Sequence, residues 1–463
     1  MFKPHWPVLV LAAIATACVP PVEPADPTPG VEPGVIGYAE CDAEHPTATV
    51  GLTLCTPDSE AGYLLLSAFG SPMTYLLDPL GRIVHSWDSQ WLPGMQVELL
   101  DDGSLMRATH HTPADPDWAA ARGGGLEQIG WGGELVWERP PREPDVYSHH
   151  DIDIQADGTV VYVAYERHTR EEALSMGRLP ERLDDDVIWP DALRRIDPST
   201  DEEVWRWAVW DHLVQDADPL LPNYGDPSSR PERIDINAAD GQGPGGYSAD
   251  WNHVNSVAYD AARHEYVITA LSQNEVWIID GDGGDLVWRW GNPEAHGGAG
   301  NPVLAGPHDA QRIPQGLPGA GNLLVFNNNG AADGGTVVQE VRPRMDDDGY
   351  ARGSIGWQEP VEVWSYASPD FASRFAGGAQ RLASGHTFIT EAETGRMFEV
   401  TPEGEIVWEY ISPIVMGGTV PQGEVPAPAS NAVFRATRIA ADHPALAGRD
   451  LSPGIPLVEP PTP

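Results

Sequence analysis

Short apolar segments separated by turns that contain glycine recur along most of this chain. Segments of roughly four to eight residues bounded by such turns are typical of β-strands rather than of helices. Apolar and polar residues alternate only imperfectly within them, as expected where both faces of a sheet are covered. The segments come in groups of four, and most groups close in Val-Trp. In the clearest group the segments are residues 254–257, 266–269, 275–280 and 286–290.

The group occurs about six times, at a spacing of roughly 40 to 65 residues. A repeat of that length holding four short strands is the signature of a β-propeller blade. We therefore predict an all-β fold, a six-bladed β-propeller, in which large tryptophan rings fill the spaces between blades. The tryptophans that close the six groups are Trp87, Trp137, Trp207, Trp288, Trp364 and Trp408.

The propeller is expected to form one domain. A chain of 463 residues would ordinarily suggest about three domains, but a closed ring of blades runs long as a single unit, which we place at residues 41–440. Residues 441–463 form a proline-rich tail. A strand-like segment at residues 431–439 is expected to complete or clasp the last blade.

Residues 1–17 have the features of an export signal, with Lys3 as a positive start and a short apolar stretch after it. Cys18 follows a small-residue cleavage pattern, so we expect a lipoprotein-type signal, a lipid on Cys18 and a proline- and glutamate-rich tether over residues 18–40. Ala15 stands where that pattern usually has leucine, and ordinary cleavage is the alternative. The expected location is the periplasm or the cell surface, with the lipid as anchor.

Export determines whether the two remaining cysteines are expected to form a disulfide or a metal site. Cys41 and Cys55 are close in sequence, and an oxidising compartment favours a disulfide over a metal site. By the chain-entropy model, closing a loop of about 15 residues contributes roughly 3 kcal/mol. We expect this bond to staple the short segment that precedes the first blade.

The charge of the chain excludes several classes of partner. The formal net charge is -42, from 69 acidic and 27 basic residues, and it repels nucleic acid and anionic membrane surfaces. We therefore expect no nucleic-acid partner, and contact with a membrane only through the lipid anchor. Lys3 is the only lysine, so the mature chain lacks Schiff-base lysines and lysine-dependent phosphate loops.

The candidate chemistry lies on the innermost strands of the blades, where equivalent positions converge on the central channel. His150 and His253 each stand seven residues before the aspartate of the following turn, and the strand pattern places His308 at the equivalent position of its blade. Three of the 15 histidines therefore crowd one side of the channel. Strand alternation points His149 to the opposite face from His150, which indicates a structural role.

These residues resemble a known family, the bacterial aryl-sulfate sulfotransferases that do not use a sulfonucleotide donor. The resemblance extends over most of residues 62–438. It implies a six-bladed propeller with its active site at one channel opening, where a sulfuryl group moves from an aryl sulfate to a phenol through a sulfated histidine, without a cofactor or metal. The motifs that carry it are residues 148–152 (SHHDI), 251–257 (WNHVNSV), 308–312 (HDAQR), 326–330 (FNNNG) and 378–382 (GAQRL).

The resemblance places the family's two channel histidines on His150 and His253 and its nucleophile on His308, and the chemistry of sulfuryl transfer indicates the other roles. His308 corresponds to the nucleophile, His253 is assigned general acid/base catalysis, and His150 is assigned stabilisation of the sulfuryl oxygens. Asn255, within the HVNS phrase, is assigned to substrate binding. The partners implied are small molecules, an aryl sulfate and a phenol.

One departure from the family pattern concerns the arginine that binds the transferred group, because Leu271 occupies that position. Removing one such oriented donor costs on the order of 3 to 4 kcal/mol in the barrier. Arg312, four residues beyond His308 and on the same face of a regular strand, is predicted to substitute for it. Two alternatives remain: a binding or scaffold propeller whose channel has lost catalysis, and a metal-dependent hydrolase that uses the three histidines as ligands.

Overall fold

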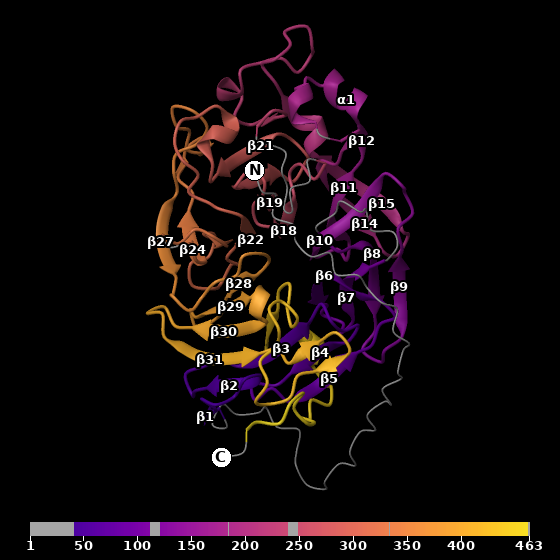
Figure 1. The fold of residues 1–463 in the computed structure, drawn as a ribbon, viewed down its shortest axis with the longest axis vertical. Coiled ribbons are helices and arrows are strands. Elements are labelled where there is room, and N and C mark those ends of the chain that lie inside the picture. The colour runs from indigo at the N-terminus through magenta and orange to yellow at the C-terminus, as the bar shows by residue number, and fades with distance from the viewer. Residues whose placement is uncertain (1–40, 112–120, 184, 239–248, 333, 462–463) are drawn as a thin grey trace, which may run out of the picture.

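The computed structural model describes residues 41–111, 121–183, 185–238, 249–332 and 334–461. Six antiparallel sheets stand around a central channel and confirm the six-bladed β-propeller. Figure 1 looks along the channel, with the innermost strands nearest its centre. The predicted signal, Cys18 and the tether lie outside the described residues. No described helix is long and apolar enough to cross a membrane.

Blades two to five are each built from one continuous stretch of chain, with the first strand innermost. Blade two contains β6 (Leu92–Leu99), β7 (Leu105–His110), β8 (Gly124–Ile129) and β9 (Leu135–Arg139). Blade three contains β10 (Val146–Ile154), β11 (Val160–Glu166), β14 (Asp191–Asp197) and β15 (Glu202–Ala208). Blade four contains β18 (Val254–Asp260), β19 (Glu265–Ala270), β20 (Glu275–Asp280) and β21 (Leu286–Trp290). Blade five contains β22 (Pro307–Arg312), β23 (Leu323–Asn327), β24 (Val337–Arg342) and β27 (Val361–Tyr366).

Both ends of the chain close the ring. The C-terminal strand β34 (Thr437–Ala440) is the innermost strand of blade one, next to β3 (Gly62–Ser67), β4 (Thr74–Leu77) and β5 (Ile83–Trp87). Blade six contains β28 (Gly378–Arg381), β29 (Thr387–Glu391), β30 (Arg396–Val400) and β31 (Ile406–Ile411), and its outer edge is extended by β2 (Gly51–Cys55) and β1 (Ala43–Glu44).

The expectation that the C-terminal segment completes the last blade is therefore wrong. That segment pairs with β3, because the first blade begins with its second strand and leaves the place beside the channel vacant. It is the N-terminal segment that adds to blade six, through pairing of β2 with β31.

The disulfide between Cys41 and Cys55 is present, as predicted. Cys55 ends β2, so the bond ties the entry of the chain to the outer edge of blade six. The segment that it staples precedes the first blade in sequence and belongs to the last blade in space.

The closing tryptophans fall into two groups. Trp87, Trp207, Trp288 and Trp408 are at most 2% exposed and lie in the core, as predicted. Trp137 and Trp364 are only partly buried, and the two residues before each of them on β9 and β27 are exposed.

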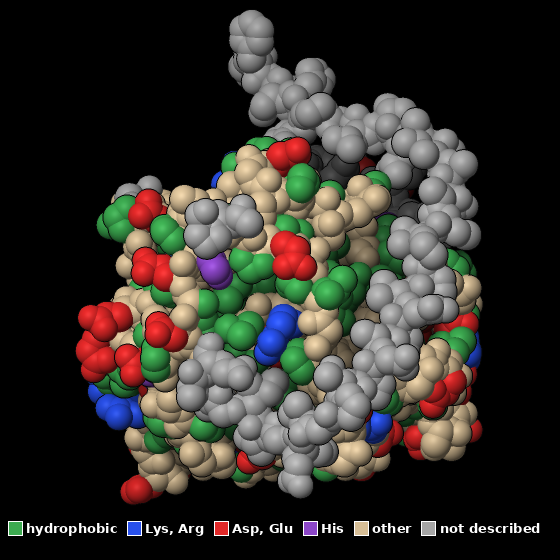
Figure 2. Space-filling model, turned by 90° about the horizontal axis from the view of Figure 1, so that it is seen from below, with side chains coloured by type: hydrophobic (Ala, Val, Ile, Leu, Met, Phe, Trp, Pro, Cys, Tyr) green, Lys and Arg blue, Asp and Glu red, His purple; other side chains and the backbone are tan. Residues whose placement is uncertain are grey.

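Two insertions lie over blades three and four, at the top of Figure 1. The first, inside blade three, contains β12 (His168–Thr169), α1 (Arg170–Ser175) and β13 (Val187–Ile188), and the second, between the blades, contains β16 (Leu213–Val214) and β17 (Ile234–Asp235). Two short hairpins complete the strands, β25 (Met345–Asp346) with β26 (Gly349–Tyr350) and β32 (Ile414–Val415) with β33 (Gly418–Thr419). On the face drawn in Figure 2, acidic side chains are spread with few basic ones between them.

Irregular backbone on the innermost strands positions the site. The pairing register shifts within β6, β10, β18 and β22, which is the sign of a β-bulge. At or beside these shifts the φ angles of Met95 (118°), His150 (54°), His253 (51°) and Asp309 (46°) are positive. Such conformations are strained for residues with a side chain, and they break the regular alternation of side chains along each strand.

Candidate active site

Three blades bring their histidines together at one level of the channel. His150 lies on β10, His253 immediately precedes β18, and His308 lies on β22. The ring centroids of His150 and His253 are 4.6 Å apart with the rings nearly perpendicular. The charge of His253 helps to lower the pKa of both other rings. All three are buried, with 3–4% of each residue exposed.

His308 is held as a neutral ring with a defined proton. Its Nδ1 lies 2.8 Å from Asn328 Oδ1 and 3.2 Å from the carbonyl oxygen of Gly306, so it donates. Its Nε2 accepts the backbone N–H of Ala376 at 3.2 Å. Burial, only partly offset by the bond to Asn328, lowers the pKa of His308 to about 4. The lone pair of Nε2 is thus the reactive position of this ring.

His253 is paired with a buried carboxylate. Its Nδ1 lies 2.5 Å from Asp250 Oδ2, and Asp250 is 0% exposed. The hydroxyl of Tyr165 stands 3.1 Å from the same nitrogen, and burial keeps the pKa of that phenol well above its usual range. A carboxylate on Nδ1 fixes the tautomer of the ring, which leaves Nε2 to give or take a proton.

His149 does not point away from His150, so that prediction is wrong. The two Nδ1 atoms are 2.7 Å apart, and His149 Nε2 is 2.9 Å from Asp191 Oδ1. The bulge between His149 and Ile152, with its positive φ at His150, turns consecutive rings toward each other. Strand alternation holds only where the register is unbroken.

Arg312 does not join the cluster in this structure. Its guanidinium forms ion pairs with Asp260 at 3.1 Å and Glu265 at 2.8 Å and also contacts the hydroxyl of Tyr350. The cause is again a bulge, because the register shift between His308 and Gln311 breaks the regular spacing along β22.

Asn255 is completely buried, and both ends of its amide are engaged within the protein. Its Nδ2 donates to the carbonyl oxygen of Pro307 at 3.0 Å, and its Oδ1 accepts from the hydroxyl of Thr269. The side chain therefore joins blade four to the residue that precedes His308. The backbone N–H of Leu271 donates to the carbonyl oxygen of His253 at 3.3 Å, which places residue 271 beside the cluster.

Among the described residues, Arg435 brings a positive charge next to the histidines, and no motif in the sequence pointed to it. It lies just before β34 and reaches Asp151 Oδ1 at 2.5 Å and Asp309 on another blade. Its charge contributes to the lowered pKa of His150 and of His308. Arg435 thus links blades one, three and five across the channel.

A cavity of about 390 Å³ occupies the channel next to Arg435. Its lining contains four acidic side chains together with Arg435 and Arg438, and three of the acids also join neighbouring blades. Asp151, Asp153 and Asp309 accept backbone N–H groups of the next blade at 2.8–3.0 Å. Burial raises the pKa of Asp153 to about 7 and that of Asp309 to about 6. The volume is within the range of small-molecule sites, and His150 and His308 are the chain neighbours of two of its lining residues.

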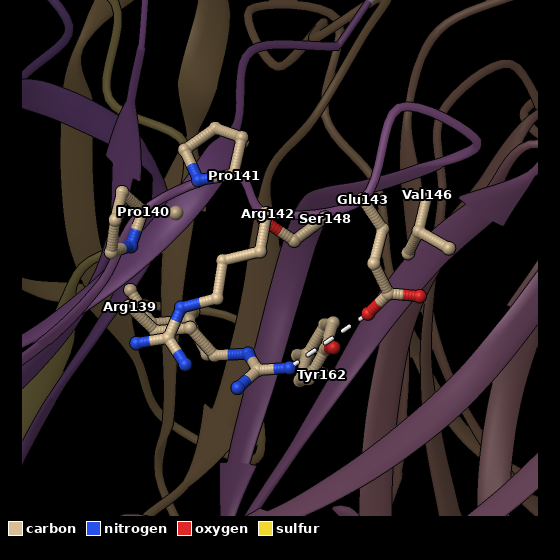
Figure 3. A pocket seen from close by; sticks show the side chains of 11 residues that line it. Arg139, Pro140, Pro141, Arg142, Glu143, Val146, Ser148 and Tyr162 are labelled. Carbon is tan, nitrogen blue, oxygen red and sulfur yellow. Dashed lines mark ion pairs between the residues drawn. The ribbon is translucent and has the colours of Figure 1, made fainter. Parts of the chain in front are cut away.

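A second cavity, between blades two and three, is too small for an aryl sulfate (Figure 3). Its volume is about 30 Å³, which is room for little more than a water molecule. Arg139 and Glu143 face each other across it at 4.0 Å. The channel is therefore the better candidate.

The described residues contain no group of three or more histidine, cysteine, aspartate or glutamate side chains arranged to hold a metal ion. Each channel histidine has its own partner: Asn328 for His308, Asp250 for His253 and His149 for His150. The part of the chain that the structure describes thus offers no support for the metal-dependent hydrolase.

The sequence matches the family model described as Arylsulfotransferase (ASST) over residues 97–413, more than half of the chain. The chain belongs to the arylsulfotransferase (ASST) family. The matched region runs from within β6 to just beyond β31 and includes His150, His253 and His308. Arg435 lies outside it. No curated protein matches the sequence.

Solved structures similar to this ASST family member are distant. A protein of unknown function from Bacteroides caccae is 10% identical, with 82% of this chain and 99% of that chain covered and a TM-score of 0.46. Virginiamycin B lyase from Staphylococcus aureus is 12% identical (70% and 71% covered, TM-score 0.35). Kuenenia stuttgartiensis hydrazine synthase is also 12% identical (80% and 81% covered, TM-score 0.39). Similarity at this level carries no argument about function.

Proposed function

We propose that this protein transfers a sulfuryl group from an aryl sulfate to a phenol through a sulfated His308. The observation that carries the proposal is the buried cluster of three imidazoles from three blades, in which each Nδ1 has a partner of its own. Such partners define which nitrogen of each ring is left for chemistry. Membership in the ASST family supports the same reaction class.

In the first half-reaction the Nε2 lone pair of His308 attacks the sulfur atom. The N–S bond forms as the bond between sulfur and the aryl oxygen breaks, and His253 gives its Nε2 proton to the departing oxygen. The transition state is loose and anionic by analogy with phosphoryl transfer, so alignment and nearby donors matter most. Before attack, the contact between Nε2 and the Ala376 N–H, 3.2 Å long, has to be released.

In the second half-reaction a phenol replaces the departed product. Phenols ionise near pH 10, so the neutral His253 takes the phenolic proton while the oxygen attacks sulfur and the N–S bond breaks. His308 regains its lone pair, and the sum is an exchange of one aryl sulfate for another. Asp250 stabilises the protonated His253 in both halves.

The oxygens of the sulfuryl group are assigned to His150. Leu271 supplies no guanidinium, and Arg435 shares its charge with Asp151 and Asp309. We therefore expect turnover to be slower than in a relative that keeps the arginine, by the roughly 3 to 4 kcal/mol that one oriented donor contributes.

The test is covalent labelling. The protein is mixed with 4-nitrophenyl sulfate without an acceptor, quenched in base, digested and analysed by mass spectrometry. We expect one SO₃ group on the peptide that contains His308 and a burst of one nitrophenolate per active site. His308→Asn should show neither, while His85→Phe, at a histidine stacked on Trp131 in blade one, should label normally. Absence of both label and burst in the wild type would refute the proposal.

A binding propeller without catalysis remains the second candidate, and two observations favour it. Leu271 removes the family arginine, and the three rings are only 3–4% exposed. Under this alternative, 4-nitrophenyl sulfate binds, as measured by calorimetry, but no nitrophenolate is released.

We also propose that the protein is exported and anchored by a lipid on Cys18, in the periplasm or at the cell surface. The Cys41–Cys55 disulfide supports an oxidising compartment. Cys18→Ala should move the protein from the membrane fraction to the soluble fraction and abolish incorporation of labelled palmitate. Unchanged fractionation would contradict the anchor.

A further inference from the structure

A chain of three buried groups stands behind His150, and the mechanism above does not use it. The chain runs from Asp191 on β14 through His149 to His150. Asp191 Oδ1 lies 2.9 Å from His149 Nε2, and His149 Nδ1 lies 2.7 Å from His150 Nδ1. The three residues are 1%, 2% and 4% exposed.

The ring of His149 is fixed in place from its flat side as well. It stacks on Tyr165 with centroids 3.6 Å apart and planes 12° apart. Among the described residues, His149 Nε2 and both carboxyl oxygens of Asp191 have no hydrogen bond of good geometry, so the 2.9 Å approach between the two groups is a close polar contact. A buried polar atom without a partner is costly, which favours alignment of this contact into a hydrogen bond, beside the contacts that the carboxyl group of Asp191 makes with the backbone N–H groups of His253 and Val254.

The surroundings favour uncharged forms along this chain. Burial, followed by the charge of Asp250, raises the pKa of Asp191 well above its usual range, although the backbone N–H groups of His253 and Val254 oppose the change. Burial, followed by the charge of His253, lowers the pKa of His149 well below its usual range. Burial does the same to His150, and the charges of His253, His149, His308 and Arg435 add to it. Two nearby buried carboxyl groups do not both ionise readily, so the raised pKa of Asp191 favours its protonated form.

We propose that Asp191 and His149 are positioning residues that hold the proton of His150 on Nε2, so that this ring presents a hydrogen-bond donor to the substrate. The role in catalysis rests on the proposed function, whereas the placement of the protons does not.

The arrangement has one donor for each acceptor. The carboxyl O–H of Asp191 donates to His149 Nε2, and His149 Nδ1–H donates to His150 Nδ1. Because Nδ1 of His150 is then an acceptor, its own proton sits on Nε2. An Nε2–H group is what a sulfuryl oxygen requires. The reverse arrangement, with Asp191 ionised, would place the proton of His150 on Nδ1 and leave Nε2 as a lone pair that repels the anionic group.

The proton positions can be read without any turnover. In protein labelled with ¹⁵N-histidine, long-range ¹H–¹⁵N spectra distinguish protonated from unprotonated ring nitrogens, and His149→Phe and His150→Gln assign the resonances. We expect His149 protonated on Nδ1 only and His150 on Nε2 only. Asp191→Asn should keep both tautomers, because the amide N–H replaces the carboxyl O–H. A wild-type His149 protonated on Nε2, or a His150 protonated on Nδ1, would overturn the proposal.

The kinetic arm uses His149→Phe, which keeps a ring on Tyr165 but removes the donor to His150. We expect kcat/KM for 4-nitrophenyl sulfate to fall by about 10- to 100-fold, the loss typical when the hydrogen-bonding partner of a metal-bound histidine is removed. The matched control, His85→Phe, also exchanges a stacked histidine and should keep its activity. Equal losses in both variants would overturn the positioning role. If the tautomers are as expected but the wild type transfers no sulfuryl group, only the proposed function fails.

Discussion

Replacing Asp250 with asparagine tests the acid/base assignment most directly. The carboxylate lies 2.5 Å from His253 Nδ1, and the two residues are 0% and 3% exposed, so solvent screens the pair little. With charge centres about 4 Å apart and an effective dielectric constant near 20, the attraction between them is about 4 kcal/mol. Asparagine removes the charge but keeps the shape. The protonated form of His253 therefore becomes harder to reach, by as much as about 1,000-fold in the rate of a step that needs it.

The assay compares two donors that differ in how much they need an acid. Phenyl sulfate has a basic leaving oxygen and requires a proton in the transition state, whereas 4-nitrophenyl sulfate leaves readily as the anion. We expect Asp250→Asn to lower kcat/KM for phenyl sulfate by about 100- to 1,000-fold and to affect 4-nitrophenyl sulfate much less.

Tyr165→Phe is the matched control, because it keeps the ring that stacks on His149 and removes only the hydroxyl near His253. It should reduce kcat/KM for both donors alike and by less than Asp250→Asn. An equal loss for both donors in Asp250→Asn would show that Asp250 maintains structure only, and no loss would refute general acid catalysis by His253.

Three further predictions concern stability. Arg435→Met leaves Asp151 and Asp309 without their cation, so it should lower the free energy of unfolding by about 3 to 5 kcal/mol and abolish transfer. Arg312→Met should also lower the free energy of unfolding but leave kcat/KM of the folded protein unchanged. A loss of activity without a loss of stability would show that Arg312 belongs to the active site. The pKa of Asp153 is raised to about 7, so this group favours folding most below its unfolded pKa near 4, and its contribution is lost as pH rises toward 7. In denaturant titrations between pH 5 and 7, Asp153→Asn should therefore lose less stability than the wild type. Parallel curves of stability against pH for the two proteins would contradict the raised pKa. Reduction of the Cys41–Cys55 bond, or Cys55→Ser, should lower the free energy of unfolding by roughly 3 kcal/mol. Thermal unfolding with and without reductant measures this loss. Equal melting temperatures would show that the strand pairing of β2 holds the segment in place without the disulfide.

Much of the fold could be predicted because its causes are local and repeat along the chain. Four apolar segments per group, each bounded by turns, cannot form an isolated blade, since a sheet with two apolar faces needs neighbours on both sides. The closing order of the ring could not be predicted, because β2 and β34 are both short strand-like segments and either can pair with a free edge.

The active site was likewise predictable only in part. The shared level of His150, His253 and His308 follows from the repeat alone, because equivalent positions of neighbouring blades must converge on the channel. The partners of these rings do not follow from it, because the bulge on β10 turns His149 toward His150 and the chain just before β18 folds Asp250 back onto His253.

By itself, the sequence determined the blades, the disulfide and the level at which three imidazoles gather, since periodicity and spacing are properties of the chain. Only the tertiary structure decided which way His149 turns, that Arg312 serves ion pairs elsewhere and that Arg435 enters the channel. The physical reason is that a positive φ at one residue redirects its neighbours, and that the side chain of Arg435, just before the last strand, meets the third and fifth blades only once the ring has closed.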